Sequence, residues 1–186
     1  MHALADDTPM VVKTFQNVSR VLNEVVAVVP DEDGDLARLL SAEGGRVIPC
    51  YRAALGMGAS IACGVAASAD ADAWVIALGD MPFLKAKSIQ LVVDALRNGA
   101  LLAAPEYRGK RGHPVGFGGI FRDELLHLPG DVGARRLLET NADQVMCIAV
   151  DDPGILIDVD TPADIKAYQN LAYNEAVAGR GRQSSL

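Results

Sequence analysis

The feature that most constrains this chain is an apolar run that ends in a single acidic residue. Residues 74–78 (Trp-Val-Ile-Ala-Leu) carry no charge, which favours a strand buried on both faces of a parallel sheet. Gly79 permits a tight exit, and Pro82 fixes the chain direction before a helical pattern begins. We therefore expect Asp80 at the carboxyl edge of the sheet, where α/β proteins bind ligands. A carboxylate there commonly holds Mg²⁺, although Asp after Gly also forms turns and helix caps.

Helical and strand patterns alternate along the rest of the chain. The expected helices cover residues 8–22, 33–42, 57–68, 85–97, 120–126, 133–138 and 161–171, and the expected strands cover 24–29, 46–49, 74–78, 101–104, 113–117, 145–150 and 155–159. This alternation predicts an α/β protein with a mostly parallel sheet, to which a turn at 106–112 adds one antiparallel strand. Residues 1–174 are expected to form one domain, and the polar segment 175–186 a flexible tail.

Composition excludes several classes of function. A net charge of −7, from 24 acidic and 17 basic residues, argues against a nucleic-acid partner, which normally requires a basic face. The sequence has no apolar stretch near the roughly 20 residues of a membrane span, and residues 1–7 do not resemble a signal peptide. The three cysteines are scattered and lack metal-ligand spacing, which indicates small buried hydrophobes in a reducing compartment. We therefore expect a cytoplasmic protein.

A second acidic cluster lies near the end of the domain, in the sequence Asp-Val-Asp-Thr-Pro-Ala-Asp at 158–164. An expected strand at 155–159 would deliver Asp158 and Asp160 to its carboxyl end, on the same face if the chain stays extended. Asp80 and Asp160 would then lie at equivalent ends of different strands. We predict that these two residues are catalytic and share one Mg²⁺. The alternative is structural, with Asp160 capping the next helix and Asp164 complementing its dipole.

Three other segments carry candidate ligand-binding groups. The helix start at 56–60 could present free backbone N–H groups to an anion. A basic turn at 108–114 could clamp a phosphorylated substrate, although a solvated turn explains it equally well. The loop at 130–136 carries an acidic residue that could cap a helix or position a substrate hydroxyl. The residues expected to contact a ligand are Gly56, Gly58, Ser60, Gly79, Arg111, His113 and Asp131.

Four motifs in this order resemble the MobA-like nucleotidyltransferases, and most closely the molybdenum cofactor cytidylyltransferases. They are Gly79-Asp80-Met81-Pro82, Arg111-Gly112-His113-Pro114-Val115, Gly130-Asp131-Val132-Gly133-Ala134-Arg135 and Asp158-Val159-Asp160-Thr161-Pro162-Ala163-Asp164. The resemblance covers roughly residues 5–172. It implies a Rossmann-like three-layer domain that transfers a nucleotide, CMP from CTP or alternatively GMP from GTP, to the phosphate of molybdopterin and releases pyrophosphate.

The resemblance also assigns roles. Asp80 and Asp160 would be the Mg²⁺ ligands, the helix start at 56–60 would face the nucleotide, and the loops of His113 and Asp131 would lie toward the pterin. It further suggests a contact with a molybdoenzyme or a chaperone.

One part of the family pattern has no counterpart here. Family members open with a strand and a Gly-rich loop that cradles the triphosphate, whereas residues 5–9 correspond to the stretch after that loop. Lys13 cannot replace the lysine of the loop, because it falls within an apolar-periodic helix. We expect an N-terminally shortened domain without the first strand and nucleotide loop. The alternative is a non-catalytic domain that has lost NTP binding. A third reading, ranked lower, takes 158–160 as the metal motif of a nucleotide-sugar glycosyltransferase.

Overall fold

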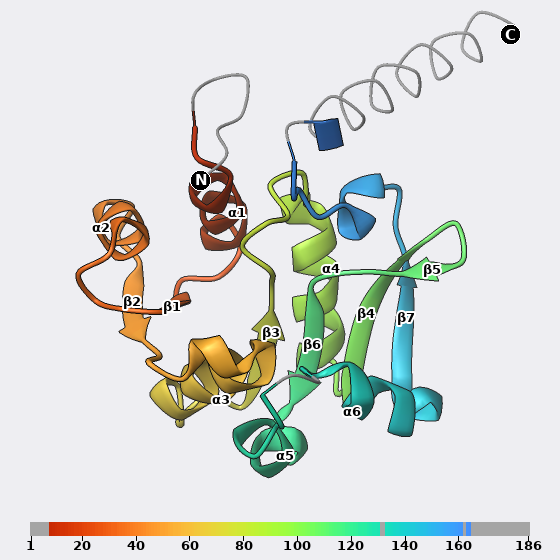
Figure 1. Cartoon of the computed structure of the whole chain (residues 1–186). Coiled ribbons are helices and arrows are strands. Elements are labelled where there is room, and N and C mark those ends of the chain that lie inside the picture. The colour runs from red at the N-terminus through yellow and green to blue at the C-terminus, as the bar shows by residue number, and fades with distance from the viewer. Residues whose placement is uncertain (1–7, 131–132, 162, 165–186) are drawn as a thin grey trace, which may run out of the picture.

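The computed structural model describes residues 8–130, 133–161 and 163–164 (Figure 1). The described α-helices are α1 (Met10–Ser19), α2 (Asp35–Ala42), α3 (Met57–Ala67), α4 (Ala86–Arg97), α5 (Arg122–Leu126) and α6 (Arg135–Thr140). The strands are β1 (Val26–Val29), β2 (Arg46–Pro49), β3 (Ala73–Ile76), β4 (Leu102–Tyr107), β5 (Lys110–Arg111), β6 (Val115–Gly118) and β7 (Val145–Ala149). Short 3₁₀ helices are η1 (Ala53–Leu55), η2 (Gly119–Phe121), η3 (Ala142–Gln144) and η4 (Pro153–Leu156).

The strands form two ladders. β1 and β2 pair in parallel, and a five-stranded sheet has the order β3-β6-β4-β5, with β7 also pairing with β4. Because β6 is antiparallel to both β3 and β4, and β7 is parallel to β4, strands β3, β4 and β7 run in one direction. The predicted antiparallel strand is therefore confirmed. The carboxyl ends of β3 and β7 lie at the same edge of the sheet, which is the arrangement the candidate site requires.

The sheet is divided between β1 and β3. Among the described residues, β1 pairs only with β2, and β3 pairs only with β6. Helix α3 bridges the division: its Gly64 lies against Val28 of β1, while Ile61 and Val65 pack in one cluster with Trp74 of β3. Within the described ranges, side-chain packing of helices therefore joins the two ladders, and no strand pairing does.

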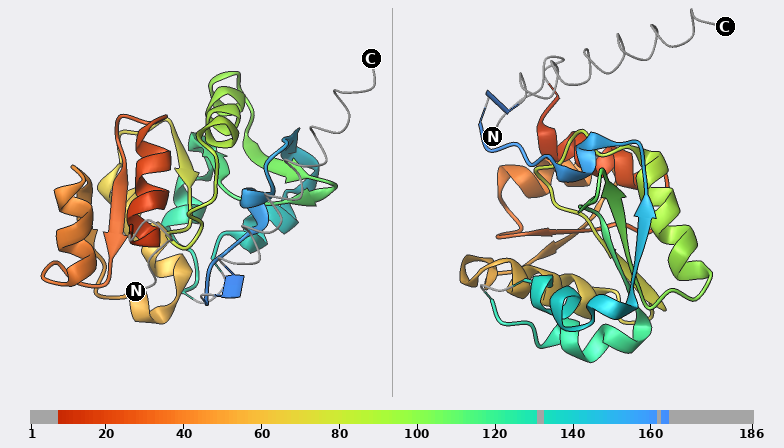
Figure 2. Two further views of the ribbon diagram at one scale, coloured as in Figure 1. Left: turned by 90° about the horizontal axis from the view of Figure 1, so that it is seen from above. Right: turned by 90° about the vertical axis from the view of Figure 1, so that its right-hand side faces the viewer.

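Helices cover both faces of the larger sheet, as the two views of Figure 2 show. On one face, Trp74, Leu102 and Phe117 pack against helices α3 and α5. On the other face, Ala103 packs against Val92 of α4. Side chains alternate between the two faces of a strand, so Leu102 and Ala103 of one strand serve different layers. The predicted three-layer α/β architecture is confirmed.

The segment 155–159 differs from the prediction, because it is not a strand. Residues 155–156 instead complete η4, which begins at Pro153. Pro153 has no N–H for a ladder, and the Asp152 carboxylate accepts a hydrogen bond from Gly154 N–H. The expected turn at 106–112 is mostly a β4–β5 hairpin. The expected tail 175–186, and most of the expected helix 161–171, lie outside the described residues.

The cysteines also differ from the prediction. Cys50, after β2, and Cys63 of α3 form a disulfide with a Cα–Cα distance of 6.0 Å, and Cys147 is exposed on β7. The tertiary contact between the end of β2 and α3 brings the pair together, which the spacing of 13 residues does not reveal. The expectation of three buried free thiols is wrong, and the argument from cysteines to a reducing compartment fails with it.

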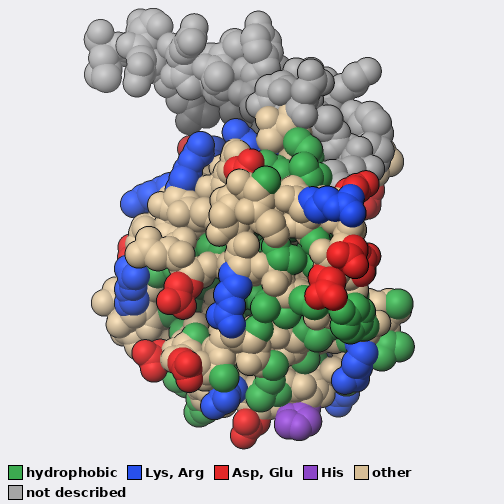
Figure 3. Space-filling model, turned by 90° about the vertical axis from the view of Figure 1, so that its left-hand side faces the viewer, with side chains coloured by type: hydrophobic (Ala, Val, Ile, Leu, Met, Phe, Trp, Pro, Cys, Tyr) green, Lys and Arg blue, Asp and Glu red, His purple; other side chains and the backbone are tan. Residues whose placement is uncertain are grey.

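Two surface properties complete the description. Within the described part of the chain, no helix is long and apolar enough to cross a membrane. Acidic and basic side chains are interspersed over the face shown in Figure 3.

Candidate active site

The loop that carries Asp80 is held by three hydrogen bonds, which come from two other segments of the chain. From α1, Thr14 Oγ1 donates a hydrogen bond to the Gly79 carbonyl (3.2 Å), and Asn17 Nδ2 donates to the Pro82 carbonyl (3.1 Å). From the acidic segment near the end of the domain, the backbone N–H of Val159 donates to the Asp80 carbonyl (2.9 Å). Such bonds, made by partners 65 or more residues away in sequence, fix the backbone on both sides of the Asp80 carboxylate.

Thr14 and Asn17 were not predicted as site residues. Both side chains are buried, with exposed fractions of 3% and 6%. They lie on the buried face of a helix whose other buried positions are Val12, Phe15 and Val18. The only signal in the sequence was the presence of two polar side chains on that apolar face, since buried polar groups need hydrogen-bond partners.

The second acidic segment meets the first at Val159. This residue is buried, with the exposed residues Asp158 and Asp160 on either side. Asp164 orders the segment locally, because its Oδ2 accepts hydrogen bonds from Asp160 N–H (3.1 Å), Thr161 N–H (2.7 Å) and Thr161 Oγ1 (2.8 Å). The structure therefore brings Asp80 and Asp160 together. The carboxylate that accepts the hydrogen bonds within this segment is that of Asp164 rather than that of Asp160.

Burial and charge perturb the Asp80 carboxyl. Burial raises its pKa, and the neighbouring Asp158 and Asp160 raise it further; a hydrogen bond from its own backbone and the nearby His113 act in the opposite direction. Asp80 Oδ1 is buried and has no hydrogen-bond partner among the described residues. An orphaned carboxylate oxygen beside further carboxylates suits a cation, which would reverse the unfavourable charge.

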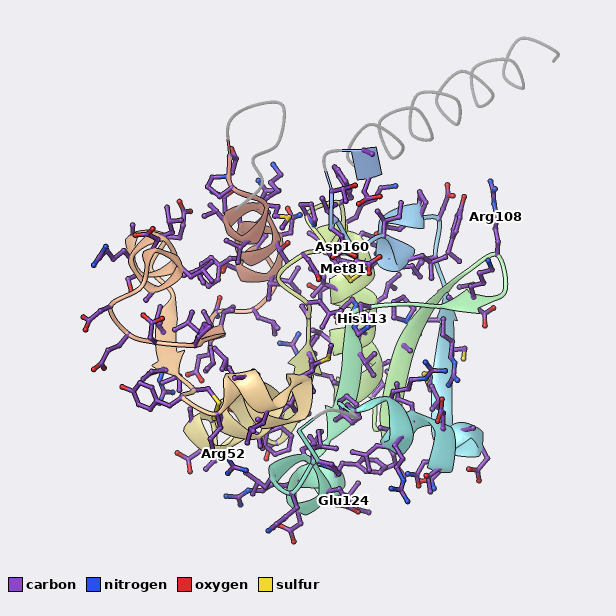
Figure 4. All side chains as sticks on the ribbon, viewed as in Figure 1. Arg52, Met81, Arg108, His113, Glu124 and Asp160 are labelled. Atoms are coloured by element: carbon purple, nitrogen blue, oxygen red, sulfur yellow. A yellow bond between two sulfur atoms is a disulfide. The ribbon has the colours of Figure 1, made fainter. Side chains whose placement is uncertain are left out.

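His113 connects this acidic region to a cavity. Burial lowers the pKa of its imidazole, while a hydrogen bond with the Ile76 backbone, Asp80 and Asp158 raise it. Nδ1 is buried and has no hydrogen-bond partner within the described ranges. Figure 4 shows His113, Met81 and Asp160 near one another at the centre of the molecule, whereas Arg108 lies on the β4–β5 hairpin, away from them.

The cavity next to His113 has a volume of about 630 Å³. It has apolar walls and a rim with basic residues from the β4–β5 hairpin and the start of α6. Its lining residues are Met57, Ile61, Ile76, Ala104, Lys110, Arg111, Gly112, His113, Val115, Phe117, Gly133, Ala134, Arg135, Leu138 and Glu139. The predicted residues Arg111 and His113 thus lie in one site, and Met57 and Ile61 bring the start of α3 to its border.

The helix start at 56–60 is used in part for packing. Gly58 N–H donates to the Gly130 carbonyl (2.9 Å), so the prediction of a free N–H group is wrong at this position. A Cβ at Gly58 would overlap the Pro129 carbonyl, and Gly56 has φ = +118°, a conformation that favours glycine. Gly58 therefore joins α3 to the 129–130 loop. Ser60 is partly buried in the first turn of α3, and Asp131 lies outside the described residues.

The acidic residues fit a divalent cation that is shared with a substrate. No group of three His, Cys, Asp or Glu side chains suited to a metal occurs in the described part of the chain. Mg²⁺ is usually bound by one or two carboxylates together with water and substrate phosphates rather than by a complete protein cage. Asp80 and Asp160 could supply such carboxylates, with Asp158 alongside.

Comparisons with known proteins identify the family and the fold. A family model described as the MobA-like NTP transferase domain matches residues 2–154. A comparison with curated proteins gave no match.

Several solved structures share the fold. The Rv0371c protein of Mycobacterium tuberculosis H37Rv, in complex with manganese, is 23% identical with a TM-score of 0.71, and the match covers 87% of this chain and 85% of that one. A nucleotidyl transferase from Methanothermobacter is 19% identical with a TM-score of 0.74, covering 92% and 83%. A CMP:2-keto-3-deoxy-manno-octonic acid synthetase in complex with CTP is 15% identical with a TM-score of 0.67, covering 90% and 89%. The matched residues show that this chain belongs to the MobA-like NTP transferase domain family of nucleotidyltransferases.

Proposed function

We propose that this domain transfers CMP from CTP to the phosphate of molybdopterin and releases pyrophosphate, with Mg²⁺ held by Asp80 and Asp160. The observation that carries the proposal is the meeting of the two acidic segments, through the hydrogen bond from Val159 to Asp80, at the sheet edge beside the cavity. In this reaction an acceptor phosphate oxygen forms a bond to the α-phosphorus, and the bond from that phosphorus to the pyrophosphate oxygen breaks. Catalysis then depends on positioning and charge neutralisation rather than on a covalent intermediate.

The metal-binding part of the proposal follows from the chemistry of the carboxylates. When bound, the cation would neutralise the phosphates and orient the reacting groups. Asp80 would provide the more rigid ligand, because its backbone is fixed by α1 and by Val159. The manganese bound by the mycobacterial protein and the CTP bound by the synthetase support a divalent ion and a cytidine nucleotide.

The cavity supports the choice of acceptor. Walls formed by Ile61, Val115 and Phe117 would exclude water from a planar ring system. Lys110 and Arg111 at the rim would neutralise an attached phosphate. A planar heterocycle that carries a phosphate fits both features, and molybdopterin belongs to this class.

The division of the sheet between β1 and β3 favours a second candidate function. In that case the domain binds the phosphorylated acceptor in the cavity and does not bind nucleotide. The lining residues of the cavity come from α3, β3 to β6, α6 and the loops beside them, so this activity would not depend on a strand between β1 and β3.

Calorimetric titration distinguishes the candidates. CTP and GTP, each with Mg²⁺, and separately a pterin phosphate, are titrated into the wild-type chain, into Asp80→Asn, and into Asp143→Asn as a control. Asp143 is exposed in η3, just before β7, and therefore lies at the opposite edge of the sheet. The proposal predicts CTP binding that Asp80→Asn abolishes and Asp143→Asn retains. Equal binding in all three proteins would contradict the metal assignment, whereas binding of a pterin phosphate without any nucleotide binding would favour the second candidate.

A further inference from the structure

Asp152 is a buried carboxylate with three hydrogen-bond donors, and it lies outside the groups proposed to contact substrate. Its exposed fraction is 1%. Oδ2 accepts from Ser88 Oγ (2.7 Å) and from Lys85 N–H (2.9 Å), and Oδ1 accepts from Gly154 N–H (3.0 Å). A buried charge is tolerated only when it is this well satisfied, so the position of Asp152 is strongly defined.

The three donors come from two separate parts of the chain. Lys85 and Ser88 belong to the start of α4, so Asp152 caps this helix from 64 or more residues away in sequence. Gly154 belongs to η4, which Asp152 also caps. One carboxylate therefore fixes the start of α4 to the segment that leads to Asp158 and Asp160.

Both parts lead directly to the proposed site. Only four residues separate Asp80 from Lys85, and two of them, Met81 and Leu84, are almost fully buried at 2% and 0% exposure. From η4, the Ile155 carbonyl accepts a hydrogen bond from His113 N–H (2.9 Å). The next four residues end at Val159, whose N–H donates to Asp80.

The packing around η4 leaves little room for movement. A Cβ at Gly154 would overlap the Phe83 carbonyl, and a Cβ at Gly112 would overlap the Ile155 carbonyl. η4 therefore lies in direct backbone contact with the Asp80 loop on one side and with the residue before His113 on the other. A shift of η4 would change the positions of the acidic residues and of the imidazole together.

We propose that Asp152 is a positioning residue, which sets the placement of Asp160 and His113 relative to Asp80 by joining α4 to η4. Its consequence for catalysis rests on the proposed function, whereas the positioning itself does not. If the Asp152 carboxylate only stabilises the fold, its removal should lower the stability of all parts of the domain equally. If it is a positioning residue, its removal should loosen the hydrogen bonds of Val159 and His113 before it loosens the rest of the fold.

Amide hydrogen exchange, followed by NMR, separates these two roles. The proteins are the wild type, Asp152→Asn and two controls. Asp94→Asn makes the same chemical change on α4 at a side chain whose partner among the described residues is Gln90, four residues earlier. Leu125→Ala lowers global stability from a fully buried position in the α3–α5 core. In Asp152→Asn, the amides of Val159 and His113 should exchange at least about tenfold faster relative to the β4 and β6 amides than they do in wild type.

Both controls should leave that ratio unchanged. Ser88→Ala removes one of the three donors and should change the ratio in the same direction by less, which keeps the test available if Asp152→Asn does not fold. An unchanged ratio in Asp152→Asn, or in Ser88→Ala if only that protein folds, would overturn the proposal.

A parallel titration with Mn²⁺, followed by electron paramagnetic resonance, adds the functional readout. Asp152→Asn should bind Mn²⁺ about tenfold more weakly than wild type, and Leu125→Ala should bind it normally. A changed exchange ratio together with no Mn²⁺ binding by the wild type would support the positioning role and contradict the proposed function. Normal Mn²⁺ binding by Asp152→Asn would overturn the positioning role at the metal site.

Discussion

The two acidic segments of the candidate site are positioned in opposite ways. Asp80 is partly buried, its Oδ1 has no hydrogen-bond partner among the described residues, and its loop is held by Thr14 and Asn17 from α1. Asp160 is exposed and is ordered by Asp164, four residues further along the chain. The first carboxylate depends on the tertiary fold, and the second depends on its own sequence neighbours.

This difference indicates how the site divides its tasks. A desolvated carboxylate held by a fixed backbone interacts strongly with a cation, because the surrounding dielectric is low. An exposed carboxylate interacts less strongly, since water competes for the same cation. We therefore expect Asp80 to dominate metal affinity, and Asp160 to contribute less.

The largest expected effect comes from Asp80→Asn. It should lower CMP transfer at least about 100-fold, in the range seen when an electrostatic stabiliser is removed from an active site. Asp160→Asn should cause a smaller loss. Initial rates at one fixed, subsaturating concentration of CTP and Mg²⁺ provide the measurement, and an equal loss in both variants would break the comparison.

Asp80→Asn should also increase the stability of the metal-free protein. Burial, Asp158 and Asp160 raise the pKa of Asp80 above its ordinary value, so its stabilising protonated form is present at low pH and is lost as pH rises through the raised pKa. At pH 7 the ionised group therefore opposes folding, and Asp80→Asn should raise Tm in scanning calorimetry with a chelator present. A lower Tm would contradict the electrostatic account.

Asn17→Ala tests the tertiary support of the Asp80 loop. It leaves the buried Pro82 carbonyl without its donor and should lower the free energy of unfolding by about 1–3 kcal/mol. Gln16→Ala on the same helix loses only an exposed hydrogen bond to Glu43, so it should change stability by less than about 0.5 kcal/mol. Urea unfolding of both variants gives the comparison, and equal effects would show that the Asn17 bond has no special role.

His113 should produce a smaller, pH-dependent effect. Burial lowers the pKa of its imidazole below 6.5, so the folded state favours the neutral ring. The associated stability is present above pH 6.5 and is lost as pH falls through the folded pKa. The metal-free wild type should therefore lose stability below pH 6.5 more steeply than His113→Gln, as measured by urea midpoints between pH 8 and 5. Parallel pH profiles would contradict this assignment.

The smallest effect is expected from Asp164→Asn. Thr161 and the Asp160 backbone N–H lower the pKa of Asp164 by hydrogen bonding, but the group is exposed. The substitution should barely change the urea midpoint at pH 7, while Mn²⁺ affinity should fall by less than it does in Asp160→Asn. A large loss of global stability would show that Asp164 supports more than its own segment.

Local patterns in the sequence predicted much of this molecule. The apolar run that ends at Gly79-Asp80 predicted a strand with a carboxylate after its end, and alternating patterns predicted the three layers. The expectation that this strand is central in a parallel sheet is wrong for the described residues, because β3 ends the five-stranded sheet and pairs antiparallel with β6. β2 and the helix at 57–67 were predicted within one residue.

The remainder depended on tertiary contacts. Nothing near Asp152 in the sequence indicates that it caps α4, and nothing near Cys50 indicates Cys63 as its partner. The segment 155–159 carries apolar residues because it packs beside α4, not because it forms a strand.

The most direct test of the central claim is an anomalous difference map from crystals of this chain soaked with Mn²⁺ and CTP. The account predicts one strong peak between the carboxylates of Asp80 and Asp160, with the triphosphate oxygens of the nucleotide completing its coordination. A peak bound elsewhere, or a nucleotide bound without any metal at these two residues, would contradict it.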